Sequence, residues 1–156
     1  MHYSEIKSHD IANGDGVRVS LWVSGCERHC KGCFNESTWD FEAGKEFDGD
    51  TVHEIIELMK PDYIQGLTIL GGEPLHPKNL YAIDSLLYNV RFAYGSTKDI
   101  WLYTGYTYDE VKDLPLMSHI DILVDGPFIE EEKDISLKFR GSRNQRIIDL
   151  KGRQNE

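Results

Sequence analysis

Residues 25–33 read Gly-Cys-Glu-Arg-His-Cys-Lys-Gly-Cys and contain all three cysteines of the chain, spaced Cys-x3-Cys-x2-Cys. Three thiolates in so short a loop can close around one metal centre, and thiolates select zinc or iron–sulfur centres over hard cations. The chain has no fourth cysteine to complete such a site. The loop directly follows the first apolar strand, so it also marks the edge of the sheet where chemistry is expected.

Three interpretations of the cysteines remain open on the residues alone. A structural zinc site needs a fourth protein ligand, and the nearest is His29, which adjoins Cys30. Unrelated structural cysteines would be scattered along the chain, whereas these share one charged loop. A [4Fe-4S] cluster normally takes four cysteines. With three, one iron keeps open positions that can bind a substrate, as an open zinc position does in catalysis.

The rest of the chain alternates strand-like and helical patterns, which predicts an α/β fold with a mainly parallel sheet and right-handed crossovers. At about 30 residues for each strand–helix unit, the chain supplies four or five such strands. We therefore expect a single domain over residues 1–156 that forms a partial, open barrel, because a closed (βα)8 barrel needs ~250 residues. The expected strands are residues 17–23, 67–70, 100–104 and 120–124, and the expected helices start near Thr51, after Pro77 and at Tyr108.

The remaining segments carry weaker signals. Residues 1–16 are polar and end in a turn, and residues 35–49 read as irregular. Thr51 and Glu54 have the spacing of a capping box. Two further strands are expected at residues 136–139 and 146–150, followed by a frayed tail at residues 151–156.

Unusual turns follow each of the four expected parallel strands. They are the cysteine loop, Gly71-Gly72-Glu73-Pro74, Thr104-Gly105 and Asp125-Gly126. In parallel α/β sheets the chemistry gathers at the carboxyl ends of the strands. The four turns are therefore expected to meet at one edge and to form one site.

The cysteine loop and the Gly-Gly-Glu-Pro turn together resemble the radical S-adenosylmethionine (SAM) superfamily. The resemblance implies that Cys26, Cys30 and Cys33 hold a [4Fe-4S] cluster, whose open iron is chelated by the amino and carboxylate groups of SAM. One electron from the cluster then cleaves the sulfonium, methionine leaves, and a 5′-deoxyadenosyl radical abstracts a hydrogen atom. No general acid or base is required, so no catalytic side chain is expected.

The resemblance also implies which residues bind SAM. Many members carry an aromatic residue before the last cysteine, beside the adenine, and here that position is Gly32. Phe34 could fill part of this role. The glycine turn and Glu73 could receive the SAM ammonium. The implied SAM-binding set is Gly32, Cys33, Phe34, Gly71, Gly72, Glu73, Thr104 and Asp125.

Softer motifs narrow the resemblance to the activating enzymes of glycyl-radical enzymes. They are Asn-Gly-Asp-Gly-Val-Arg at residues 13–18, Asp-Gly-Pro-Phe at 125–128, Gly-Ser-Arg-Asn-Gln-Arg at 141–146, and Asn35 after the cysteines. Gly32 and the short chain point within that family to activators of anaerobic ribonucleoside-triphosphate reductase. The implied partners are the large glycyl-radical subunit of that reductase and an external one-electron donor such as flavodoxin or ferredoxin.

Two alternatives stay open. One is an activator of a different glycyl-radical enzyme, such as pyruvate formate-lyase, although such activators usually run longer. The other is a non-catalytic zinc-binding adaptor that uses the three cysteines and His29.

Charge and hydropathy bound the remaining possibilities. The formal net charge of -10 argues against a nucleic-acid binder, which would need a basic face. No apolar run approaches the ~20 residues of a membrane span, and the N-terminus lacks the pattern of a signal peptide. Three clustered cysteines make a poor disulfide framework, so a reducing cytoplasm is the expected setting.

Overall fold

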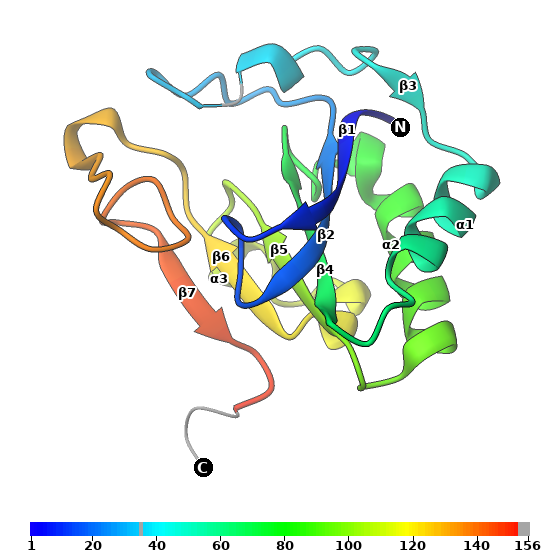
Figure 1. Cartoon of the computed structure of the whole chain (residues 1–156). Coiled ribbons are helices and arrows are strands. Elements are labelled where there is room, and N and C mark those ends of the chain that lie inside the picture. Colours follow the sequence, from blue (N-terminus) through cyan, green and yellow to red (C-terminus); the bar gives the residue numbers. More distant parts are fainter. Residues whose placement is uncertain (35, 153–156) are drawn as a thin grey trace.

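The four expected parallel strands form the centre of the sheet in the computed structural model, which describes residues 1–34 and 36–152. They are β2 (Val17–Val23), β4 (Ile64–Gly71), β5 (Asp99–Tyr103) and β6 (Ile122–Asp125), hydrogen-bonded in that order and all parallel. Two long helices lie between them in sequence and pack on one face, α1 (Gly49–Leu58) and α2 (Pro77–Tyr94) (Figure 1). Their alternation of strand and helix confirms the α/β class.

The sheet as a whole is mixed, so the prediction of four or five mainly parallel strands was wrong. Over the described residues it has seven strands in the order β3-β1-β2-β4-β5-β6-β7. The three outer strands, β1 (His2–Asp10), β3 (Lys45–Glu46) and β7 (Arg146–Asp149), all pair antiparallel with their neighbours. β1 escaped the sequence pattern because most of its side chains are polar and lie exposed or half-buried. Its backbone pairs with β2. The partial barrel stays a prediction.

Two local expectations also change. Residues 136–139 do not form a strand, since Phe139 has a φ of 65°, which a strand cannot accommodate. Helix α1 begins earlier than expected, because Asp48 is its N-cap and forms a capping box with Thr51.

Asn35 and residues 153–156 of the expected tail lie outside the described residues. The short elements are α3 (Tyr108–Val111) and the 3-10 turns Glu36–Thr38, Pro115–His119 and Glu130–Glu132.

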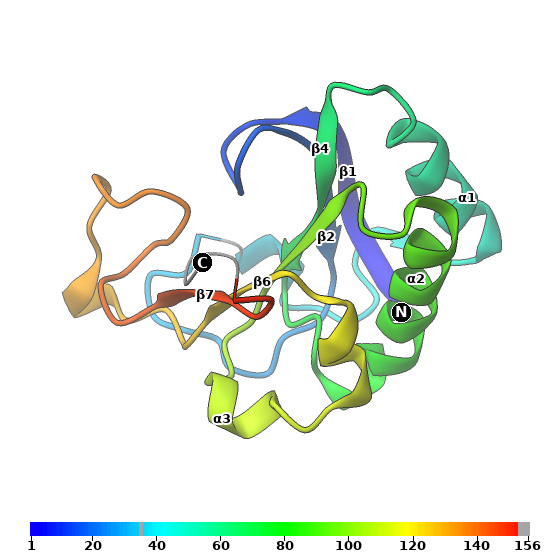
Figure 2. The ribbon, with the colours of Figure 1, turned by 90° about the horizontal axis from the view of Figure 1, so that it is seen from below.

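The main hydrophobic core lies between the sheet and the two long helices. Leu21, Leu67, Ile69, Ile83 and Leu87 are fully buried there. Figure 2 shows α1 and α2 on this side of the sheet and the segment between β6 and β7 on the other. A smaller cluster forms around Trp101, Ile122 and Val124. In the part of the chain that is described, no helix is both long enough and apolar enough to cross a membrane.

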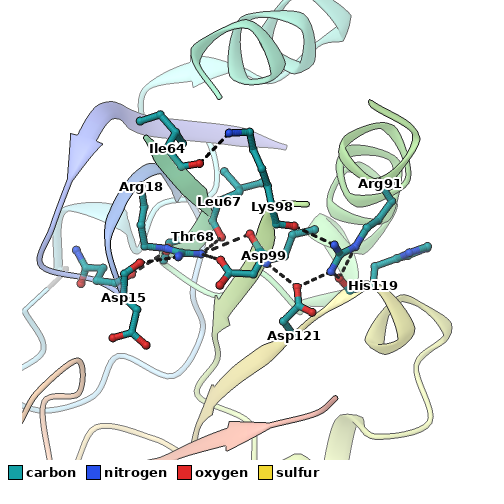
Figure 3. A network of polar contacts seen from close by, with 12 residues as sticks. Asp15, Arg18, Ile64, Leu67, Thr68, Arg91, Lys98, Asp99, His119 and Asp121 are labelled. Carbon is teal, nitrogen blue, oxygen red and sulfur yellow. Dashed lines mark hydrogen bonds and ion pairs between the residues drawn. The ribbon is translucent and has the colours of Figure 1, made fainter. Parts of the chain in front are cut away.

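A buried arginine ties three neighbouring strands together near their amino ends (Figure 3). Arg18 on β2 is fully buried. Its Nε donates to Thr68 Oγ1 at 2.7 Å, and its Nη2 donates to Leu67 O at 3.0 Å and to Asp99 Oδ1 at 2.6 Å. Its Nη1 donates to Asp15 O at 2.9 Å. These contacts satisfy the guanidinium, as a buried charge requires, at the opposite end of the strands from the cysteine loop.

A second arginine fixes the helix layer to the same end of the sheet (Figure 3). Arg91 of α2 donates to His119 O at 2.7 Å and pairs with Asp121. The same carboxylate accepts from Ile100 N at 2.8 Å. Both arginine networks therefore brace the amino ends of the strands, and the turns that carry the cysteines and glycines lie at the carboxyl ends.

Asp10 should stabilise the fold in a pH-dependent way. Burial alone would raise the pKa of Asp10, but hydrogen bonds from Asn13, Ser20 and the Ala12 amide outweigh burial and lower it. A lowered folded-state pKa contributes stability that is present above the ordinary value of 3.8 and is lost as the pH falls through the folded value.

Asp10→Asn is therefore expected to cost about 2 kcal/mol at neutral pH, or roughly 4–8 °C in Tm. The difference from the unsubstituted chain should narrow below pH 3.8. Thermal unfolding of the metal-free protein between neutral pH and pH 3 measures the loss in Tm and its decrease at low pH. Asp62→Asn, at an exposed position, is the control. An equal loss in both variants would contradict the assigned role of Asp10.

Candidate functional site

The turns after the four parallel strands meet around one cavity of about 120 Å³. The expected convergence of the strand ends is therefore present. Most of the predicted site residues line this cavity, namely Cys26, Cys30, Cys33, Gly71, Gly72, Glu73 and Thr104. Of the described residues that were predicted for the site, Gly32, Phe34 and Asp125 do not line it.

The cysteine loop is held by backbone hydrogen bonds to the segment that follows it. Gly25 N donates to Thr38 O at 2.6 Å, and Cys26 N donates to Trp39 O at 3.0 Å. Gly25 has a φ of 102°, and a Cβ there would lie 2.0 Å from the Phe41 ring, so only glycine fits. These contacts fix where the loop leaves β2 and bring Trp39 to the cavity.

The three cysteine side chains are half-buried. Burial raises the pKa of the Cys26 thiol, backbone hydrogen bonds from Arg28 and His29 oppose this, and the nearby Glu73 charge raises it further. A metal centre must therefore displace the proton when Cys26 becomes a ligand. As the described side chains lie, no three Cys, His, Asp or Glu residues are placed to hold a metal ion. The three cysteines line one cavity, and their sulfurs would have to converge there to bind one.

The Gly71-Gly72 turn packs directly on the cysteine loop. Gly72 N donates to Val23 O at 2.8 Å, and Glu73 N donates to Gly25 O at 2.7 Å. A Cβ on Gly72 would lie 2.6 Å from Gly25 O, so a side chain would push the two turns apart. The glycines allow this close approach, and the two motifs form one rigid wall of the cavity.

Glu73 is a buried carboxylate in this wall, with only 3% of its surface exposed. It accepts hydrogen bonds from Thr104 Oγ1 at 2.7 Å, Gly105 N at 2.7 Å and Leu75 N at 3.0 Å. Burial raises the pKa of Glu73, and these hydrogen bonds together with Arg28, whose Nε lies 3.9 Å away, oppose the rise. Thr104 thus holds the carboxylate in place, and the carboxylate can attract a cationic ligand.

Asp125 is almost fully buried, but its carboxylate has other partners. It receives Arg146 Nη2 at 2.6 Å and Nε at 3.1 Å, and the Tyr108 amide at 2.8 Å. These contacts join β6 to β7 and to α3. Its neighbours Val124 and Gly126 line the cavity instead.

Gly32 and Phe34 flank Cys33 but do not line the first cavity. Gly32 is exposed, with a φ of 74°, and lies beside the Glu130 side chain. Phe34 packs on Phe128, with 5.1 Å between ring centroids, and lines a second cavity.

This second cavity, of about 500 Å³, lies beside the first and shares part of its lining. The shared residues are Cys33, Leu70, Tyr103, Phe128 and Gln145.

Two aromatic residues of the cysteine cavity, Tyr103 and Trp39, are not predicted as site residues from the sequence. Each carries a buried polar atom without a hydrogen-bond partner among the described residues, Tyr103 Oη and Trp39 Nε1. The sequence feature that could have identified Trp39 is its position nine residues after Cys30, in a segment that has neither a helical nor a strand pattern. Tyr103 lies at the end of an expected strand, where packing is the ordinary explanation for an aromatic side chain.

The residues present fit an iron–sulfur cluster. The donor set consists of three cysteine sulfurs, the type of donor that iron–sulfur clusters take. These cysteines line a cavity together with glycines and with an indole N–H that lacks an acceptor among the described residues. The His29 ring stacks on Trp39 with 4.3 Å between centroids and 10° between planes, and among the described residues it belongs to no group of three side chains placed to hold a metal ion.

Comparisons with known proteins agree with this chemistry. A family model described as a 4Fe-4S single cluster domain matches residues 12–148. Three relatives carry the name anaerobic ribonucleoside-triphosphate reductase-activating protein. The Vibrio cholerae relative is 44% identical, covering 94% of this chain and 97% of its own. That of phage T4 is 42% identical, covering 94% and 93%. That of Escherichia coli K12 is 41% identical, covering 97% and 100%. The resemblance to activators of anaerobic ribonucleoside-triphosphate reductase is confirmed: the chain belongs to the anaerobic ribonucleoside-triphosphate reductase-activating proteins and contains a 4Fe-4S single cluster domain.

Proposed function

We propose that this chain activates anaerobic ribonucleoside-triphosphate reductase by generating a glycyl radical on it, as a radical SAM oxidoreductase. One observation carries the proposal: the three cysteines and the buried Glu73 of the Gly-Gly-Glu-Pro turn line the same cavity. A soft-metal donor set beside a carboxylate suits a ligand that has an ammonium group and also binds a cluster.

Different residues of the cavity would bind the cluster and SAM. Cys26, Cys30 and Cys33 would ligate three irons of a [4Fe-4S] cluster and leave the fourth open. Glu73, held by Thr104 and Gly105, would receive the ammonium of SAM. Cluster and SAM together supply reductive cleavage of the sulfonium by one electron, which ends in removal of a hydrogen atom from glycine. The protein binds, orients and shields these groups.

The second cavity offers a place for the partner. It adjoins the cysteine cavity, shares Cys33 and Tyr103 with it, and has about 500 Å³. A glycine-bearing segment of the reductase could enter there and bring its α-hydrogen to the shared wall.

We also propose that an external one-electron donor reduces the cluster, in a reducing cytoplasm. Residues 1–156 would form a single domain whose sheet curves into a partial barrel.

Anaerobic reconstitution with iron and sulfide tests the chemistry. With SAM and a strong reductant, the loaded protein should release methionine and 5′-deoxyadenosine in equal amounts. A protein that takes up stoichiometric zinc and shows no response to SAM would contradict the proposal.

Glu73→Gln is expected to weaken SAM binding roughly 10–100-fold, because a hydrogen bond to a charged group contributes ~1.5–3 kcal/mol. The cluster should still assemble, since Glu73 is not a ligand. Equilibrium binding of SAM to the reconstituted, oxidised protein measures the effect. Glu27→Gln is the matched control, because Glu27 lies in the cysteine loop but is exposed and contacts His76 instead. Equal affinity in Glu73→Gln and the unsubstituted protein would refute the role of Glu73.

A further inference from the structure

The indole nitrogen of Trp39 is a buried hydrogen-bond donor that the described fold does not satisfy. Its indole Nε1–H is buried and has no hydrogen-bond partner among residues 1–34 and 36–152. Burying an N–H without an acceptor is unfavourable, because the group gives up its hydrogen bonds to water and gains none in return. Natural structures seldom keep such a group without a reason. The acceptor is therefore expected to come from whatever occupies the adjacent cavity.

The position of Trp39 is well fixed. Its carbonyl accepts from Cys26 N at 3.0 Å, and its ring stacks on His29 at 4.3 Å between centroids. Both contacts come from the cysteine loop itself. The ring lines the same cavity as Cys26, Cys30 and Cys33. The backbone and the ring of Trp39 thus each contact the cysteine loop, which positions the indole relative to the three cysteines.

We infer that Trp39 Nε1–H donates a hydrogen bond to a sulfur of the cluster, either a cysteine sulfur or a bridging sulfide, and so sets its reduction potential. The inference rests on the proposed function, because it requires the cluster to be held by the three cysteines. Sulfur is the acceptor favoured by the surroundings, since the Trp39 ring stacks on the loop that supplies the sulfurs and lines the same cavity as the three cysteines.

The physical consequence is a shift of the redox equilibrium. Reduction adds negative charge to the cluster, and a hydrogen bond to sulfur stabilises the more negative state. Trp39 therefore makes the cluster easier to reduce by a biological one-electron donor. Trp39 acts as a positioning and tuning residue, and the cysteines remain the ligands.

Trp39→Phe keeps an aromatic ring for the stack on His29 and removes the N–H. The ratio of reduced to oxidised cluster at a fixed potential should fall about tenfold, which is ~59 mV for one electron. A redox titration followed by EPR measures the shift. Trp22→Phe is the matched control, because Trp22 lines the second cavity and not the cysteine cavity. Its potential should be unchanged.

A direct signature comes from protein labelled with ¹⁵N-indole tryptophan. Pulsed EPR of the reduced cluster should detect a weakly coupled ¹⁵N, which disappears in Trp39→Phe and persists in Trp22→Phe. If Trp39→Phe fails to fold, the ¹⁵N signal of the unsubstituted protein still decides the matter.

The outcomes separate this inference from the proposed function. An absent ¹⁵N coupling, or an unchanged potential in Trp39→Phe, overturns the inference while the cluster and SAM cleavage stand. Weaker SAM binding with an unchanged potential also overturns it, because the N–H would then serve SAM. An unsubstituted protein that assembles no cluster overturns the proposed function itself.

Discussion

Cys30→Ala is expected to lose the iron–sulfur absorption and SAM cleavage together, down to background. With two of the three proposed ligands left, the site is expected to lose the cluster, because the chain has no other cysteine to replace the missing one. Iron and sulfide content, visible absorption and 5′-deoxyadenosine release after anaerobic reconstitution measure the loss. Retained cleavage in this variant would refute the ligand assignment.

His29→Phe is the control that separates iron–sulfur from zinc chemistry. Phenylalanine keeps a ring to stack on Trp39, as His29 does, but it cannot ligate a metal. An iron–sulfur site held by three cysteines keeps its cluster in this variant. A zinc site completed by His29 loses its metal.

Arg18→Ala is expected to destabilise the fold by about 3–5 kcal/mol, or roughly 6–20 °C in Tm. The substitution leaves Asp99 without its 2.6 Å ion pair and opens a cavity where the guanidinium lay fully buried. It also removes the donors to Thr68 and Leu67 that link β2 to β4. Since a domain is stable by only about 5–15 kcal/mol, the loss is a large share of the total.

Thermal and denaturant unfolding of the metal-free protein measure this change. Arg143→Ala, at an exposed position, should leave Tm unchanged. The double variant Arg18→Ala with Asp99→Ala should cost less than the sum of the two single variants, because neither charge is then left buried alone. Strict additivity would mean that the two side chains do not stabilise each other.

The central sheet and most of the site can be predicted from the sequence. Apolar runs identify β2, β4, β5 and β6, and the alternation with helices implies their parallel order. Because parallel strands share an edge at their carboxyl ends, the order of the motifs along the chain is enough to bring Cys26, Gly72 and Glu73 together. Both inferences follow from local patterns and a general rule of chain topology.

Features that depend on distant partners could not be predicted in this way. Asp125 ends a strand at the correct edge, but Arg146, twenty-one residues later, takes its carboxylate. Trp39 reaches the cavity only because the irregular segment folds back and pairs with Cys26. β1 is held by backbone pairing, which leaves no apolar pattern to read.

Activation of the reductase tests the proposed function most directly. The reconstituted protein is incubated anaerobically with the large reductase subunit, SAM and a reductant, and the EPR spectrum is recorded. We expect the doublet of a glycyl radical on the reductase, absent when SAM is omitted or when Cys30→Ala replaces the unsubstituted protein. An intact cluster that cleaves SAM but yields no doublet on this reductase, and yields one on another glycyl-radical enzyme, would contradict the proposed function.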